Sequence, residues 1–81
     1  MVVYNLEKEI KKTIAEVFKV SEEVIIDSLS IGDIPEWDSM GNMNLMRALE
    51  ENFNIDIPLE DLFELTSVTS IIEEVRKLVN A

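Results

Sequence analysis

The residue in this chain best placed to do chemistry is Ser39, which lies in the run 36–41, Glu-Trp-Asp-Ser-Met-Gly. An amphipathic helix is predicted to begin there, and the exposed N–H groups and dipole of a helix N-terminus favour a bound phosphate. The sequence contains no Cys and no His, so a thiol nucleophile, a Cys–His pair and a histidine general base are excluded. Such a chain would obtain reactive groups by covalent attachment, and Ser39 is the first candidate.

Two Asp-Ser dipeptides occur in the sequence, and they end at Ser28 and Ser39. Gly32 and Pro35 follow Ser28 and would interrupt a helix there. Ser39 is followed by fourteen residues without proline, so only Ser39 is predicted to lie at a useful helix start. The alternative is that Asp38 or Ser39 acts only as an N-cap, the commonest role of these residue types at that position.

The spacing of apolar residues predicts four helices. Proline is tolerated in a first turn, so the Ile-Pro pair at 57–58 can open a short third helix. The second helix is expected to bury a face that contains Met43, Met46, Leu49 and Phe53. The predicted helices cover residues 5–19, 39–53, 57–63 and 68–79, with Asn5 and Ser67 as N-caps of the first and last.

Residues 20–38 form a connection longer than compact domains usually contain. Residues 24–26 are Val-Ile-Ile and could form a strand, but a single strand would have no evident partner. We instead predict a loop whose apolar residues cover one end of a helix bundle. The fold class is therefore all-α: a small four-helix bundle with three long helices and one short third helix, in one domain spanning residues 1–81.

The charge distribution is uneven, with a formal net charge of −10. No basic stripe is present to neutralise phosphates, which argues against nucleic-acid binding. Residues 20–64 hold twelve acidic side chains and a single basic one, Arg47. Such charge often only solubilises a surface, but its position around Ser39 favours the steering of basic partners. No stretch has the apolar length of a membrane span, so a cytoplasmic protein is expected.

Short motifs at fixed distances cover nearly the whole chain. After the run 37–41, the second helix is predicted to end with Ala-Leu-Glu-Glu-Asn-Phe at 48–53, the Ile-Pro pair follows at 57–58, and Ser-Val at 67–68 opens the last helix. Together these motifs resemble those of acyl carrier proteins. A lone Asp-Ser pair would indicate nothing, whereas the combination is specific.

The resemblance implies that Ser39 is esterified with 4′-phosphopantetheine, which a Mg²⁺-dependent phosphopantetheinyl transferase takes from coenzyme A. The thiol of this arm would carry acyl or aminoacyl groups as thioesters, so the chain would be a carrier and not an enzyme. Asp38 would flank the site presented to the transferase. An acyl- or aminoacyl-loading ligase and an acyl transferase would be further partners of a monomeric carrier. Partner docking is assigned to Met40, Arg47, Glu50, Glu51, Glu60 and Asp61.

Three positions on the second helix depart from the pattern of fatty-acid carriers. Gly41, Asn44 and Arg47 stand where those carriers typically place acidic, acidic and apolar surface residues. The Trp-Asp-Ser-hydrophobic-Gly form at 37–41 resembles free-standing carriers of specialised pathways, such as surface polysaccharide or secondary-metabolite assembly. Arg47 could select against fatty-acid enzymes, or it could simply pair with one of the two glutamates at 50 and 51.

One alternative remains for the chain as a whole, an unmodified helical module that binds partners through its acidic face. Such a module would share the size, charge and helix content of a carrier. Only the use of Ser39 separates the two interpretations.

Overall fold

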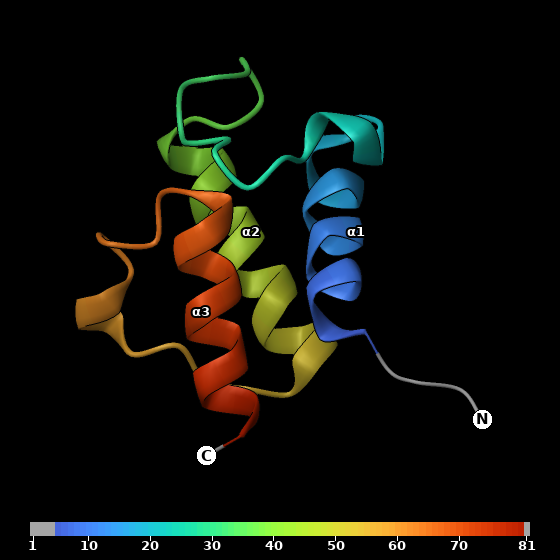
Figure 1. Cartoon of the computed structure of the whole chain (residues 1–81). Coiled ribbons are helices and arrows are strands. Elements are labelled where there is room, and N and C mark those ends of the chain that lie inside the picture. The colour runs from blue at the N-terminus through green and yellow to red at the C-terminus, as the bar shows by residue number, and fades with distance from the viewer. Residues whose placement is uncertain (1–4, 81) are drawn as a thin grey trace.

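Three α-helices make up most of the fold: α1 (Leu6–Phe18), α2 (Ser39–Phe53) and α3 (Val68–Val79). The computed structural model describes residues 5–80 (Figure 1), so the outermost residues of the predicted domain, 1–4 and 81, lie outside this range. Residues 5–80 contain no strand longer than one isolated bridge, and the all-α class is confirmed. None of the described helices is both long and apolar enough to cross a membrane.

Helices α1 and α3 begin at the predicted N-caps. The Asn5 side chain accepts a hydrogen bond from the Lys8 N–H at the start of α1, and Lys19 ends that helix in the left-handed conformation. At the start of α3, Ser67 and Ser70 form a capping box, in which each side chain accepts from the backbone N–H of the other.

The expected short third helix is not a regular α-helix. After Pro58 the chain forms one turn of 3-10 helix, η2 (Leu59–Asp61), and then continues through turns toward α3. A short helix is stabilised mainly by an apolar face that packs on the rest of the protein. Here Leu59 and Phe63 are exposed and Leu62 is only partly buried, so little packing is available to stabilise a longer helix. Within residues 5–80 the bundle therefore has three α-helices instead of four.

The segment between α1 and α2 crosses one end of the bundle, as predicted (Figure 1). Ile25 and Leu29 are buried. A strand was the alternative for residues 24–26, but the chain forms a 3-10 turn, η1 (Glu22–Val24), and residues 25 and 26 are not in a strand. The segment between α1 and α2 forms backbone hydrogen bonds, and its partners are the residues at the start of α3 and just before it. Ile31 N donates to Thr66 O at 2.8 Å, and the N–H that opens α3 donates to Leu29 O at 2.9 Å. These bonds place the segment across the start of α3.

An ion pair joins the same segment to α1. Lys11 Nζ lies 2.7 Å from Asp27 Oδ1 and 3.5 Å from Glu7 Oε1. The hydrogen bond to Asp27 is the main reason why the pKa of Lys11 is raised. Thr69 Oγ1 also donates to the backbone carbonyl of Asp27 at 2.8 Å, so residue 27 is held by both α1 and α3.

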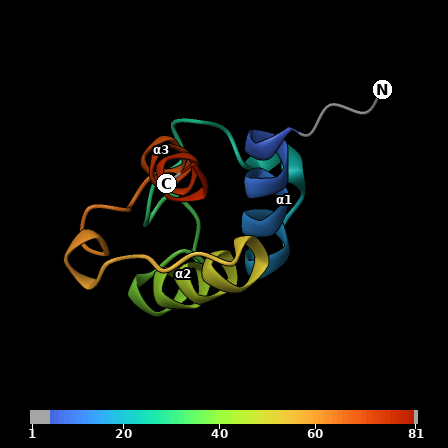
Figure 2. The ribbon, with the colours of Figure 1, turned by 90° about the horizontal axis from the view of Figure 1, so that it is seen from below.

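The core lies where the three helices meet (Figure 2). One correction concerns α2, because Met43 was expected in its buried face and is 56% exposed. The buried positions of this helix are 42, 45, 46 and 49, which form one face at the helical period. Met43 lies beside this face. Fully buried core side chains come from all three helices and include Ile10, Ile14, Leu45, Leu49, Ile71 and Val75.

The capping box gives a first prediction. Replacing Ser67 with alanine removes an acceptor from the first turn of α3, so Ser67→Ala should lower the free energy of unfolding by about 1 kcal/mol. Urea denaturation of the variant and the wild type measures this difference in the free energy of unfolding. Ser28→Ala is the matched control, because Ser28 is exposed, and it should change stability by less than about 0.5 kcal/mol. Equal stability of the two variants would contradict the capping role.

Candidate functional site

Ser39 is the first residue of α2 and is exposed. Asp38 is the N-cap, and its Oδ1 accepts a hydrogen bond from Gly41 N at 2.7 Å. Asp38, and not Ser39, is therefore the N-cap of α2. The Ser39 hydroxyl forms no hydrogen bond with any residue in the range 5–80, so it is available for reaction at the positive end of the helix dipole.

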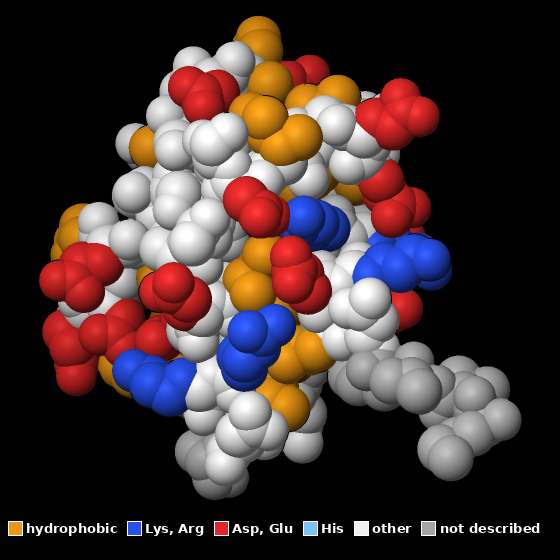
Figure 3. Space-filling model, in the orientation of Figure 1, with side chains coloured by type: hydrophobic (Ala, Val, Ile, Leu, Met, Phe, Trp, Pro, Cys, Tyr) orange, Lys and Arg blue, Asp and Glu red, His pale blue; other side chains and the backbone are white. Residues whose placement is uncertain are grey.

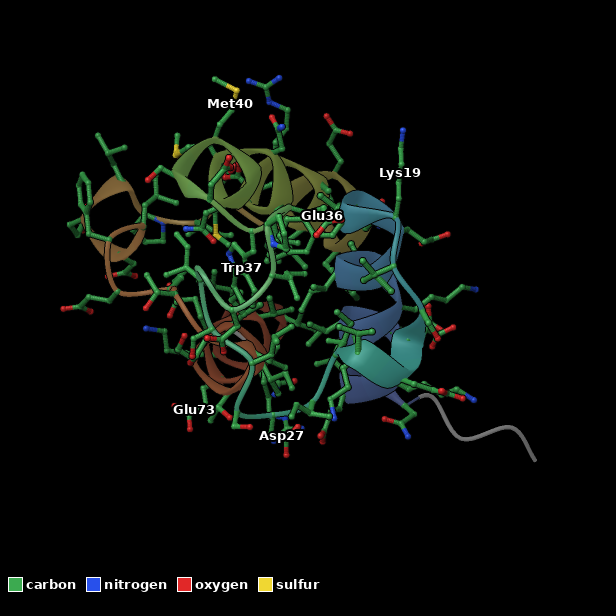
Figure 4. All side chains as sticks on the ribbon, turned by 90° about the horizontal axis from the view of Figure 1, so that it is seen from above. Lys19, Asp27, Glu36, Trp37, Met40 and Glu73 are labelled. Atoms are coloured by element: carbon green, nitrogen blue, oxygen red, sulfur yellow. The ribbon has the colours of Figure 1, made fainter. Side chains whose placement is uncertain are left out.

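Trp37 fixes the chain immediately before this helix. The indole is fully buried, and its Nε1 donates to Asn42 Oδ1 at 2.9 Å. Figure 4 shows Trp37 between the three helices. The centroid of its ring lies 5.4 Å from the centroid of the Phe18 ring. The buried ring thus anchors the loop that enters α2. The partner amide of Asn42 was not predicted, although a polar residue on the buried face of α2 was a signal that could have indicated it.

Gly41 allows the loop to approach the first turn of α2. A side-chain Cβ at this position would collide with the backbone carbonyl of Glu36 and would crowd Phe18. Figure 4 shows Glu36 beside the start of α2, near the end of α1. The glycine that departs from the fatty-acid pattern thus has a structural cause, the close approach of residue 36.

A groove of about 420 Å³ opens beside Ser39, between α2 and the segment that contains η2. Met43 forms one apolar wall, and residues 59, 62 and 63 form the opposite wall. Asn42 and Thr66 add polar groups to the lining. The exposed hydroxyl with an apolar groove next to it suits a flexible chain attached to the serine oxygen.

The predicted docking residues are not all equivalent. Met40 is 74% exposed and points away from the bundle in Figure 4. Glu50 differs, because its Oε2 accepts a hydrogen bond from Ile57 N at 2.9 Å and so holds the turn after α2. Arg47 forms no ion pair within residues 5–80, so the alternative pairing with a neighbouring glutamate is not formed. The other exposed members of the set are Arg47, Glu51 and Glu60, and Asp61 is half-buried.

Comparison with known proteins agrees with this geometry. A model of the family described as "Phosphopantetheine attachment site" matches residues 8–75. The chain belongs to this family. The acyl carrier protein of Buchnera aphidicola subsp. Baizongia pistaciae (strain Bp) is 42% identical over 76 residues, which cover 93% of this chain and 96% of the relative. The solution NMR structure of holo acyl carrier protein from Geobacter metallireducens is similar with a TM-score of 0.82 at 28% identity, over 93% of this chain and 86% of that one.

Membership of the acyl carrier protein family establishes the general function. The chain is a carrier and not an enzyme, and it bears a covalently attached 4′-phosphopantetheine. The family also implies interaction with a phosphopantetheinyl transferase and with enzymes that handle acyl groups. The comparison therefore excludes the alternative of an unmodified interaction module.

The contact at Gly41 gives a second prediction. In most helices a change from glycine to alanine stabilises the protein by about 0.5–1 kcal/mol. In this acyl carrier protein homologue the added methyl group would meet the Glu36 carbonyl, so Gly41→Ala should instead lower the free energy of unfolding by about 1–2 kcal/mol. The matched control is Asn44→Ala, at an exposed position of the same helix, which should be neutral or slightly stabilising. Greater stability of Gly41→Ala in urea denaturation would contradict the close approach.

Proposed function

We propose that Ser39 is the residue esterified with 4′-phosphopantetheine, and that residues 1–81 act as one carrier domain. The observation that supports this proposal is the position of Ser39, which is exposed at the first residue of α2 while Asp38 performs the capping. By contrast, Ser28 lies in the segment between α1 and α2, and no helix begins at it.

The start of α2 suits the phosphate of the arm. The first N–H groups of a helix have no partner within the helix, and together with the helix dipole they favour a negatively charged group. Asp38 occupies one of them, that of Gly41. The bound arm supplies a thiol, which this chain lacks, and that thiol holds acyl or aminoacyl groups as thioesters.

The partner enzymes of this monomeric, cytoplasmic carrier are proposed to meet the outer face of α2 and the segment after it. Glu51 and Glu60 are exposed there and would attract basic partners. Asn44 and Arg47 make the outer face of α2 less acidic, so they disfavour enzymes that select carriers by negative charge alone. We therefore place the chain with carriers of specialised pathways, loaded by a dedicated acyl or aminoacyl ligase.

The attachment site gives a third prediction. Incubation of the purified protein with coenzyme A, Mg²⁺ and a broad-specificity phosphopantetheinyl transferase should raise its intact mass by one phosphopantetheine. Ser39→Ala should abolish the increase because the accepting oxygen is gone. Ser28→Ala is the matched control, since it alters the other Asp-Ser pair, and should be modified like the wild type. No mass increase with several transferases, or modification of Ser39→Ala, would contradict the proposal.

The charge on the docking face gives a fourth prediction. Glu51→Lys and Glu60→Lys should each slow association with the loading ligase several-fold at low salt, because long-range attraction raises the rate of encounter. Arg47→Glu should accelerate it. Stopped-flow mixing measures these rates. Glu16→Lys makes the same charge change at an exposed position on α1 and should have a smaller effect. Rates that respond equally to Glu16→Lys and Glu60→Lys would show that only the net charge matters.

A further inference from the structure

The Asn42 side chain lies between a buried hydrogen bond and an open groove. Asn42 is only 7% exposed, and its Oδ1 accepts a hydrogen bond from Trp37 Nε1 at 2.9 Å. An indole nitrogen can only donate, so the amide oxygen must face the ring and the amide nitrogen must face away from it. The bond to Trp37 therefore fixes the amide of Asn42 in one orientation.

The amide nitrogen of Asn42 has no acceptor within residues 5–80. In that range Glu74 Oε2 is the side-chain polar atom that is both fully buried and unpaired, so Asn42 Nδ2 is not closed off from solvent. Asn42 lines the groove beside Ser39. Because its oxygen faces Trp37, its nitrogen is the polar atom that Asn42 offers to the groove. The groove therefore contains an amide donor for which the protein supplies no partner.

Most of the remaining lining is apolar, and it includes Met43, Leu59, Leu62 and Phe63. A plain hydrocarbon chain in the groove would cover the amide nitrogen of Asn42 and leave it without a partner, which is unfavourable. An oxygen atom at that point would accept the hydrogen bond, while the apolar walls contacted the rest of the chain. The groove therefore suits a mainly apolar chain that carries an oxygen acceptor.

The position of Asn42 in α2 brings the donor within reach of a chain attached to Ser39. Residues three apart in a helix are neighbours on its surface, and both residues line the same groove. The phosphopantetheine arm itself carries a hydroxyl group and amide carbonyls, and an acyl group on its thiol can bring a further oxygen. Each of these oxygens is an acceptor that Asn42 lacks within the protein.

The charge around the groove disfavours an anionic acyl group. Glu60 and Glu64 are exposed on the segment that forms one wall of the groove. Figure 3 shows acidic side chains gathered at the edge of the molecule where Figure 1 places η2. A carboxylate on the attached acyl group would be repelled by these side chains. The acceptor that fits best is the neutral oxygen of a carbonyl or hydroxyl group.

We propose that Asn42 binds the chain attached to Ser39: its amide nitrogen donates a hydrogen bond to a neutral oxygen of that chain and holds the chain in the groove. The oxygen belongs either to the arm or to the acyl group. This proposal rests on the assignment of Ser39 as the attachment site. Where the oxygen belongs to the acyl group, the groove favours hydroxyacyl groups over saturated acyl groups of the same size.

Nuclear magnetic resonance of the nitrogen-15-labelled wild type tests the proposal, because it detects the side-chain amide directly. A broad-specificity transferase would produce the holo form from coenzyme A, and two loaded forms from butyryl-coenzyme A and 3-hydroxypropionyl-coenzyme A. These acyl groups are equal in size, and a terminal methyl in one is a hydroxyl in the other. In at least one form, the Asn42 amide protons should move downfield and exchange with water roughly three- to tenfold more slowly than in the unmodified protein.

The same spectra contain the control and identify the oxygen. Asn44 is exposed on the same helix and does not line this groove, so its side-chain amide protons should not change. A change at Asn42 that is already complete in the holo form would assign the oxygen to the arm. A change that appears only with the 3-hydroxypropionyl group would assign it to the acyl group. Either result supports the proposal.

Asn42→Asp provides a second test, because a carboxylate can still accept from the Trp37 indole but cannot donate. Cleavage of the thioester by hydroxylamine measures how firmly the chain is held in the groove, with each rate divided by that of the same thioester on coenzyme A. For the loaded form in which the amide signal changes, Asn42→Asp should raise this ratio several-fold. Asn44→Asp adds the same charge at an exposed position of α2 and should leave the ratio unchanged.

The outcomes that would overturn the proposal can be told apart. If the wild type is modified and the Asn42 amide signals are the same in all forms, the amide binds only water, and the proposal is wrong while the assignment of Ser39 stands. Equal acceleration of cleavage by Asn42→Asp and Asn44→Asp would show an effect of charge alone and would also contradict it. If Asn42→Asp does not fold, the wild-type spectra still decide. If several transferases leave the wild type unmodified, the assignment of Ser39 and this proposal both fail.

Discussion

The hydrogen bond between the Trp37 indole and the Asn42 amide, 2.9 Å long and closed off from solvent, determines where α2 begins. An unpaired indole N–H or amide in that position would cost about 1–3 kcal/mol. The bond therefore favours the one arrangement in which the loop ends at residue 38 and the helix starts at residue 39. Gly32, with φ +90°, closes the loop behind it by donating its N–H to the Trp37 carbonyl at 2.8 Å.

This arrangement separates two roles that a helix start often combines in one residue. Asp38 caps the helix, and the exposed serine that follows it is free to accept a group. Gly41 makes the separation possible because the backbone of residue 36 passes too close for any side chain. The site thus depends on the fully buried ring of Trp37 and on the exposed hydroxyl of Ser39, two residues later. The buried ring holds the backbone in place, and the hydroxyl remains accessible to partner enzymes.

The sequence predicted the parts of the fold that depend on local signals. Caps at Asn5 and Ser67 and the apolar period gave the bounds of the three α-helices to within about one residue, because capping and amphipathic packing act over a few residues. The conformation of residues 57–63 could not be predicted in this way. That segment has helical spacing, but whether its apolar residues are buried depends on where α2 and α3 lie.

The candidate site also combines features that local sequence predicts with features that it does not. Ser39 could be identified from its neighbours in the sequence. The involvement of Glu50 with the backbone at Ile57 and the exposure of Phe63 each require the positions of two elements at once.

Tandem mass spectrometry of peptides from the modified wild-type protein would show which residue bears the arm. Fragment ions should place phosphopantetheine on Ser39 alone, and the peptide that contains Ser28 should be unmodified. Phosphopantetheine on any other residue would contradict the assignment of Ser39.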